Sequence, residues 1–197
     1  MPQMTSPKEL FIHELQDMYY AEKTLTKVLP KLASESKDRE LTKAFKDHLA
    51  ETRGQIQNLE QVFKNIGKRA QGEKCPGIDG IQEEHESFMK ENEPTELLSD
   101  VFITGSAARA EHYEIAAYTG LINQAKALGE RDSATLLEEN LRQEKAALKK
   151  VETISKRILK ASKPTAKSTN GGRRPSHGRR GASAADVHAL RRREADV

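Results

Sequence analysis

The chain has 197 residues and a formal net charge of +3; 36% of the residues are hydrophobic, 32% are charged, 5% are aromatic and none is Trp. This composition supports one core of aliphatic side chains and favours a helical bundle over a β-sandwich. No apolar run reaches the roughly 18 residues of a membrane-spanning helix, and the N-terminus lacks the basic and apolar segments of a secretory signal. Because Cys75 is the only cysteine, no disulfide can form within the chain. We therefore expect a cytoplasmic protein without a membrane partner.

Two long helices are predicted in the first third of the chain. Ser6 followed by Glu9 forms a capping box at the start of the first helix. Apolar residues then recur at steps of three and four, and Pro30 predicts a kink or an end. The second helix is predicted to begin near residues 36–38 and to stop at Gly67.

The next segment, KRAQGEKCPG, is rich in residues that interrupt helices. A short helix is predicted over IQEEHESFMKE, with Asp79 at its cap. Two more long helices follow, one from about Pro94 to Gly129 and one that opens near Asp132. No alternating strand pattern is found.

Four long helices with two short turns and one long crossover predict an all-α, ferritin-like four-helix bundle with a short extra helix in the crossover. The composition changes abruptly after Ala161 and becomes rich in Pro, Gly, Ser and Arg. We therefore divide the chain into a helical bundle over residues 1–161 and a disordered basic tail over residues 162–197.

Acidic residues interrupt the apolar stripe of each long helix near its middle. They are Glu22, then His48 with Glu51, then Glu111 with Glu114, and finally Glu144. Residues three apart on a helix lie about 60° apart, so each pair shares a face. Glu22 and Glu51 are 29 residues apart, and Glu111 and Glu144 are 33 residues apart. Two hairpins of similar length would bring all these side chains together at the same height.

A set of carboxylates in one core predicts a metal site. An isolated buried carboxylate costs several kcal/mol or takes up a proton, and two cations would offset the charge of several. Carboxylate-rich ligation with one imidazole suits iron or manganese better than structural zinc. The alternatives are that each Glu reaches water from the edge of the core and that His48 is simply hydrogen-bonded there; four interruptions at matching heights favour metal.

Two tyrosines lie one helical turn from these acids. Tyr19 precedes Glu22, and Tyr118 follows Glu114. Each can be an ordinary core residue, can hydrogen-bond a metal ligand, or can act as a redox partner.

Several motifs resemble the YciE/YciF group of bacterial ferritin-like stress proteins. The resemblance covers residues 6–159 and is carried by ELFIHELQDMYYAEKTL, HLAETRGQIQNLEQVF, AEHYEIAAY and LEENLRQEKAALKKVE. It implies a ferritin-like bundle with an extra helix, a carboxylate-bridged di-metal centre and a homodimer. AEHYEIAAY is also similar to the Glu-x-x-Glu helix of rubrerythrins.

The wider ferritin-like pattern has Glu-x-x-His on the second and fourth long helices, and this chain departs from it twice. On the second helix the order is reversed, with His48 before Glu51, and on the fourth helix Ala147 stands three residues after Glu144. Glu114 is the natural replacement for the missing imidazole. An enzyme with this pattern would be an oxidoreductase of the ferroxidase or peroxidase kind.

Two functions remain open at this level. In the first, the chain binds two iron or manganese ions and reacts with oxygen or peroxide during stress, with Glu51 and Glu144 as bridging ligands and the other four residues as terminal ligands. In the second, the chain is a non-catalytic helical adaptor whose core acids are protonated or solvated.

The C-terminal tail carries a charge opposite to that of the bundle. Of the 33 basic and 30 acidic residues, ten basic and three acidic residues lie from residue 160 onward, a net of +7; the first 159 residues hold 23 and 27, a net of −4. The tail could neutralise DNA phosphates in weak, non-specific nucleic-acid contacts. The alternative is a solubilising tail without a partner.

Overall fold

The computed structural model describes residues 3–161, whose regular structure is entirely helical. The helices are α1 (Pro7–Glu35), α2 (Arg39–Asn65), α3 (Pro76–Asn92), α4 (Glu96–Ala127) and α5 (Arg131–Ala161). The predicted all-α class is confirmed. Residues 162–197 lie outside the described residues, so the disorder and nucleic-acid contacts expected of the basic tail stay predictions.

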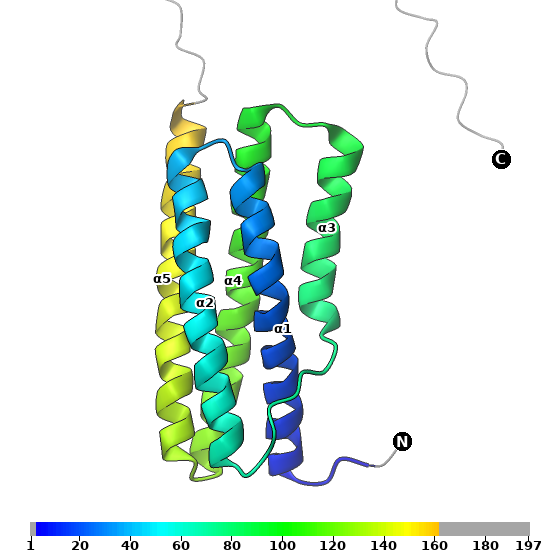
Figure 1. The fold of residues 1–197 in the computed structure, drawn as a ribbon, viewed down its shortest axis with the longest axis vertical. Coiled ribbons are helices and arrows are strands. Elements are labelled where there is room, and N and C mark those ends of the chain that lie inside the picture. Colours follow the sequence, from blue (N-terminus) through cyan, green and yellow to red (C-terminus); the bar gives the residue numbers. More distant parts are fainter. Residues whose placement is uncertain (1–2, 162–197) are drawn as a thin grey trace, which may run out of the picture. The chain divides into compact units, whose positions relative to one another are not determined.

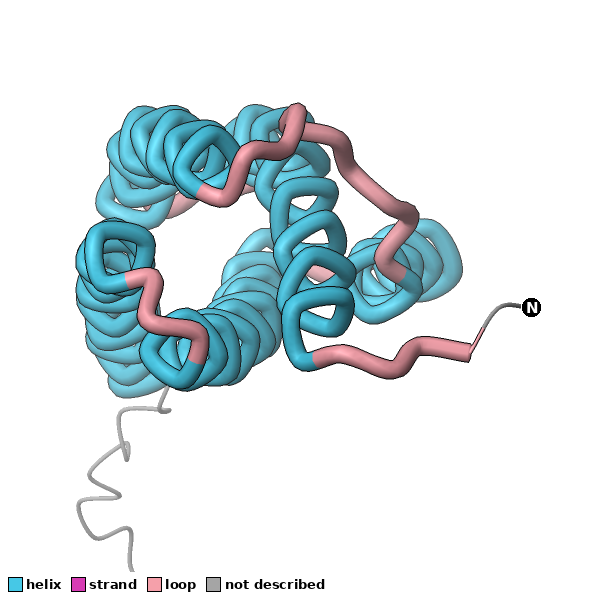
Figure 2. The backbone as a smooth tube through the Cα atoms, turned by 90° about the horizontal axis from the view of Figure 1, so that it is seen from below, coloured by secondary structure: helices cyan, strands magenta, loops and turns pink. Residues whose placement is uncertain are grey.

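The four long helices α1, α2, α4 and α5 form the predicted ferritin-like bundle (Figure 1). α1 packs against α2 and α4, and α5 packs against the same two helices. Successive helices run in opposite directions, so α1 and α5 lie diagonally across the bundle, as the view along its axis shows (Figure 2). The bundle axis is therefore faced by all four long helices, and α3 lies outside against α4 and α1.

The turn between α1 and α2 is fixed by a carboxylate from α4. The two carboxylate oxygens of Asp100, a buried residue, accept hydrogen bonds from the backbone N–H groups of Lys37 and Asp38, both at 2.9 Å. The Asp38 side chain caps α2 and also accepts a hydrogen bond from Arg157 of α5 at 2.6 Å. These contacts join α1, α2, α4 and α5 at one end of the bundle.

Most predicted helix boundaries agree with the structure, with two corrections. α1 does not end at Pro30 but continues to Glu35, because Pro30 lies on the exposed face of the helix, where water can replace the hydrogen bond that a proline cannot make. α3 begins at Pro76 rather than near Asp79, since proline is favoured at a first helical position, where the missing N–H breaks no bond. The predicted stop at Gly67 is confirmed by its φ of 70°.

The crossover runs alongside α1 before it enters α3 (Figure 1). The backbone N–H of Glu73 donates to the carbonyl of Gln16 at 3.2 Å. Stacking of Phe88 on Phe102, with ring centroids 3.6 Å apart, holds α3 on α4. None of the helices described has the length and apolar run that a membrane span needs.

Candidate metal centre

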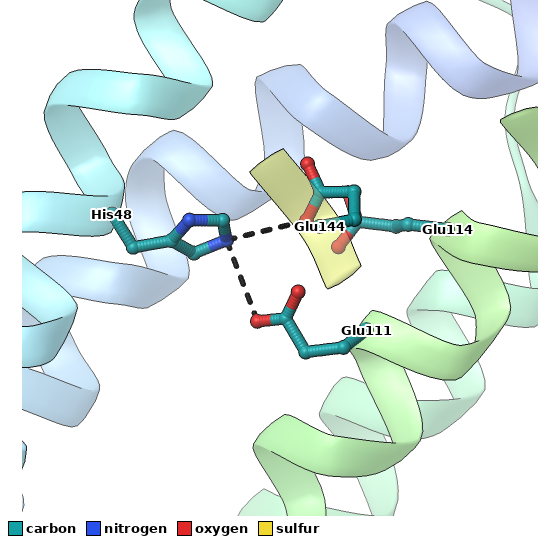
Figure 3. A group of neighbouring side chains, drawn as sticks. All are labelled: His48, Glu111, Glu114 and Glu144. Atoms are coloured by element: carbon teal, nitrogen blue, oxygen red, sulfur yellow. Dashed lines mark ion pairs between the residues drawn. The ribbon is translucent and has the colours of Figure 1, made fainter. Parts of the chain in front are cut away.

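Side chains from three helices converge in the middle of the bundle. His48 of α2, Glu111 and Glu114 of α4, and Glu144 of α5 each offer a ligand atom, and these four atoms all lie within 4.8 Å of one another. The His48 Nε2 atom is 3.4 Å from Glu111 Oε1 and 3.6 Å from Glu144 Oε2, as the dashed lines of Figure 3 mark. All four residues are buried. The structure thus brings together four of the six predicted site residues in a group that could hold a metal ion.

Glu22 of α1 reaches the same core but is not part of that four-residue group. It is completely buried, and its Oε1 atom accepts a hydrogen bond from the Tyr118 hydroxyl. Burial, followed by the charge of Glu144, raises the pKa of Glu22 well above its usual range. The Glu22 carboxylate therefore extends the acidic interior toward α1.

Glu51 lies at the edge of the centre rather than inside it. Its side chain is 49% exposed, whereas Thr52 and Gln55 fill the interior face of α2 with no exposure. The predicted interior position of Glu51 is wrong, because the buried stripe runs from His48 to Thr52 and Gln55 and leaves Glu51 on the flank. Its role as a metal ligand stays a prediction.

The Glu51 carboxylate is nevertheless bonded to the cluster through His48, with 3.3 Å between its Oε2 atom and His48 Nδ1. This hydrogen bond lowers the pKa of Glu51, so the carboxylate is ionised near neutral pH. An Nδ1–H group that donates to Glu51 would leave the Nε2 lone pair of His48 directed at the carboxylates of the cluster.

Buried carboxylate oxygens of the four-residue group and of Glu22 lack hydrogen-bond donors. Within residues 3–161, five buried carboxylate oxygens accept no hydrogen bond: Glu22 Oε2, Glu111 Oε2, both oxygens of Glu114 and Glu144 Oε2. Each unsatisfied buried group costs about 1–3 kcal/mol, and more when it is charged. Burial is also the largest cause of the raised pKa values of Glu111 and Glu114, and neighbouring carboxylates add to it. The core therefore requires protons or cations.

A neutral polar network supports one side of the cluster. The Asn140 side chain accepts from Asn58 at 2.7 Å and donates to the Tyr118 hydroxyl at 3.0 Å. Since the Tyr118 oxygen accepts from Asn140, its own proton is directed to Glu22. The Gln55 side-chain amide donates a hydrogen bond to Glu144 Oε1.

Gln55 and Asn140 belong to this site although the sequence did not predict them. Asn140 lies one turn before Glu144 on the buried face of α5. Polar residues four apart on a helix share a face, so this spacing could have indicated that Asn140 lies beside the site. The possible role of Tyr118 as a partner of a site residue is confirmed, whereas Tyr19 donates instead to Glu60 on the exposed side of the bundle.

The histidines other than His48 in the described range lie away from the cluster. His13 contacts Glu73 at 3.2 Å, and His112 is exposed. His85 of α3 contacts Glu35 of α1 at 2.8 Å. The cluster therefore contains one imidazole, as predicted.

A cavity of about 130 Å³ lies between α2 and α5 and reaches the cluster. His48 and Glu111 form its inner wall, and Ala147 lines it at the position where the wider ferritin-like pattern has a histidine. Open space thus lies beside Ala147, while Glu114, the expected replacement for the missing imidazole, lies in the four-residue group.

Comparisons with known proteins agree with this fold. Residues 6–163 match the family described as a domain of unknown function, DUF892. The chain is 40% identical to Protein YciF of Escherichia coli strain K12 over 144 residues, which cover 73% of this chain and 86% of that protein. The crystal structure of the E. coli stress protein YciF matches with a TM-score of 0.76 and 36% identity, covering 80% of this chain and 99% of the other.

A second solved structure gives the same result. YcfI from Rhodopseudomonas palustris matches with a TM-score of 0.75 and 40% identity over 77% of this chain and 96% of the other. The resemblance to the YciE/YciF group that the motifs predict is confirmed, and the chain belongs to the DUF892 family.

Proposed function

We propose that this chain is a stress protein whose core binds two iron or manganese ions and reacts with oxygen or peroxide. The observation that carries the proposal is the set of five buried carboxylate oxygens that accept no hydrogen bond within residues 3–161; four of them belong to residues grouped with one imidazole. Its relation to stress rests on the likeness to the E. coli stress protein YciF.

The donor set fits hard cations. It combines carboxylate oxygens with the Nε2 atom of His48 and contains no thiolate, because the single Cys75 contacts Tyr113 at 2.8 Å instead. Structural zinc favours thiolates and imidazoles, whereas iron and manganese accept carboxylate-rich sites.

Two ions are proposed because the acids extend beyond the four-residue group. His48 and Glu111 would hold the first ion, Glu22 and Glu114 the second, and Glu144 would serve both. Glu144 contributes to the raised pKa of each of the other three buried acids, which supports its central position. When bound, two ferrous ions together would supply the two electrons that, with two protons, reduce one peroxide molecule to two water molecules.

The residues of the chain prepare the core for this exchange of charge. Tyr118 and Gln55 each donate one hydrogen bond to a carboxylate, which orients Glu22 and Glu144. Burial raises the pKa values of Glu22, Glu111 and Glu114, which favours their protonated forms in the metal-free protein. Cations would displace these protons, so metal affinity should increase with pH.

Elemental analysis of the protein, expressed with added iron and separately with added manganese, tests the proposal. We expect close to two ions per chain, as in other di-metal bundles. The double substitution Glu111→Gln and Glu144→Gln should abolish binding, whereas Glu139→Gln, at an exposed position on the same helix as Glu144, should not. A metal content below about a tenth of that value in the unmodified protein would refute the proposal.

The second candidate is a non-catalytic helical adaptor. The raised pKa values favour it, since protons alone could neutralise three of the acids. This function predicts that a chelator leaves the melting temperature unchanged, whereas a metal that binds only the folded state must raise it. In either case we propose a cytoplasmic homodimer, which light scattering of the purified chain would test for its oligomeric state.

A further inference from the structure

The cavity between α2 and α5 connects solvent to the His48 side of the cluster. Its outer rim includes Glu51 and Lys150, whose side chains are 49% and 47% exposed, and its inner wall includes Glu111, whose side chain is 5% exposed. A volume of about 130 Å³ has room for several water molecules. A cation could therefore enter with part of its hydration shell.

Oxygen and nitrogen ligands follow one another along this path. The Glu51 carboxylate lies at the exposed end, 3.3 Å from His48 Nδ1, and the Nε2 atom of the same imidazole lies 3.4 Å from Glu111 Oε1. At the inner end, Glu111 Oε2 is buried and accepts no hydrogen bond from any described residue. The path thus begins at an ionised carboxylate and ends at an unpartnered one.

The positive charge on the rim is already paired. Lys150 lies 3.2 Å from Asp47, which also contacts Lys43 at 2.6 Å. Glu51 has no lysine or arginine partner within salt-bridge distance among the described residues. The rim therefore presents the Glu51 carboxylate, which is hydrogen-bonded to His48 and lies near a lysine that is itself paired with Asp47.

We propose that this cavity is the entry port for divalent cations and that Glu51 captures each cation and transfers it to His48 and Glu111. The inference rests on the proposed function, since it assumes that cations occupy the core. It also gives Glu51 a role different from the bridging position predicted from the sequence.

The test follows the kinetics of cobalt(II) binding to the full-length, metal-free protein by the visible absorption of the bound ion. Glu51→Gln keeps a hydrogen-bond acceptor for His48 but removes the charge. Glu152→Gln makes the same chemical change on α5 at a carboxylate with 47% exposure and serves as the control. Ala147→Leu narrows the cavity without changing a charge.

We expect Glu51→Gln to slow cobalt uptake, and cobalt release to a chelator, by about tenfold, the lower end of electrostatic effects on association. At saturating cobalt, the final cobalt content should stay as in the unmodified protein. Ala147→Leu should slow both steps in the same way, and Glu152→Gln should change neither. Uptake by the unmodified protein should also slow as salt is added.

Three results would overturn the inference. Uptake at the normal rate in Glu51→Gln would show that this residue only orients His48, and a lower final cobalt content would show that it is a resident ligand. A normal rate in a folded Ala147→Leu protein would show that cations enter elsewhere. By contrast, an unmodified protein that binds no cobalt at all would refute the proposed function itself.

Discussion

The substitution Glu114→Gln removes an ionisable group from the core while keeping the size of the side chain. Glu114 is 1% exposed, and neither of its carboxylate oxygens has a hydrogen-bond partner in the described part of the chain. Burial and the charge of Glu144 raise the pKa of Glu114 well above 4.5. The folded protein therefore favours the protonated form. The stability that this preference contributes is fully present below about pH 4.5 and is lost as the pH rises through the raised pKa.

The size of the pH effect on stability follows from how many carboxyl groups have raised pKa values. Each carboxyl group with a raised pKa changes the free energy of unfolding by up to about 1.4 kcal/mol per pH unit. Glu22, Glu111 and Glu114 all have raised pKa values, so the metal-free protein should lose stability as the pH rises. Glu114→Gln should reduce that slope by up to about 1.4 kcal/mol per pH unit, or about 3–6 °C in melting temperature.

Bound metal should make the unmodified protein more stable than Glu114→Gln, the reverse of the order without metal. A cation at about 100 times its Kd stabilises the folded state by about 2.7 kcal/mol, which raises the melting temperature by about 5–11 °C. Glu114→Gln should lose much of this gain, because a neutral amide is a poorer ligand for a hard cation. Without metal near pH 8, in contrast, the variant should be the more stable protein.

Thermal unfolding followed by circular dichroism from about pH 5 to about pH 8, with either a chelator or manganese, measures both effects. Glu139→Gln, at an exposed carboxylate 3.7 Å from Arg142, is the control. Parallel melting curves for the unmodified and Glu114→Gln proteins across this pH range without metal would refute the argument from protonation. A full manganese-dependent rise in the variant would refute the assignment of Glu114 to the metal centre.

Other substitutions test the surroundings of the centre. Tyr118→Phe removes the donor to Glu22, so we expect a loss of about 1–2 kcal/mol in urea unfolding and a manganese Kd higher by about tenfold or more; an unchanged Kd would show that the hydroxyl does not position the ligand. Asp100→Asn should cost about 1–3 kcal/mol in the same assay equally with and without metal, because it weakens the turn at the end of the bundle. Deleting residues 163–197 should abolish retention on immobilised DNA at low salt while leaving the melting temperature unchanged, and retention by the shortened chain would assign any binding to the bundle.

The helices could be predicted because their signals are local. Ser6 and Glu9 form the capping box that the sequence predicts, and Gly67 ends α2 in the left-handed conformation. The end that Pro30 could predict does not occur, because the cost of a proline depends on which face of α1 meets water, a property of the packed bundle. The sequence shows that a proline removes one helical hydrogen bond. Only the fold shows whether water can replace that hydrogen bond.

Only those residues of the candidate site that place a charge on an otherwise apolar helix face could be predicted from the sequence. Glu22, Glu111, Glu114 and Glu144 are buried as expected, because each interrupts an otherwise apolar face. Glu51 could not be placed, since positions about 60° apart on a helix can fall on either side of the boundary of the core. Neutral partners such as Gln55 and Asn140 gave a weaker signal, because amide side chains are also common on helix surfaces.

The two sides of the centre differ in a way that assigns them different tasks. On the α1 side, Glu22 is completely buried and is held by the Tyr118 hydroxyl, which Asn140 holds in turn. On the α2 side, His48 faces a cavity, and Ala147 stands where the wider ferritin-like pattern has an imidazole. If the core binds ions as proposed, the alanine that replaces one ligand also lines the path by which ions and small oxidants would reach the others. Exchange with solvent should then occur first at the His48 position, and an ion beside Glu22 should leave last.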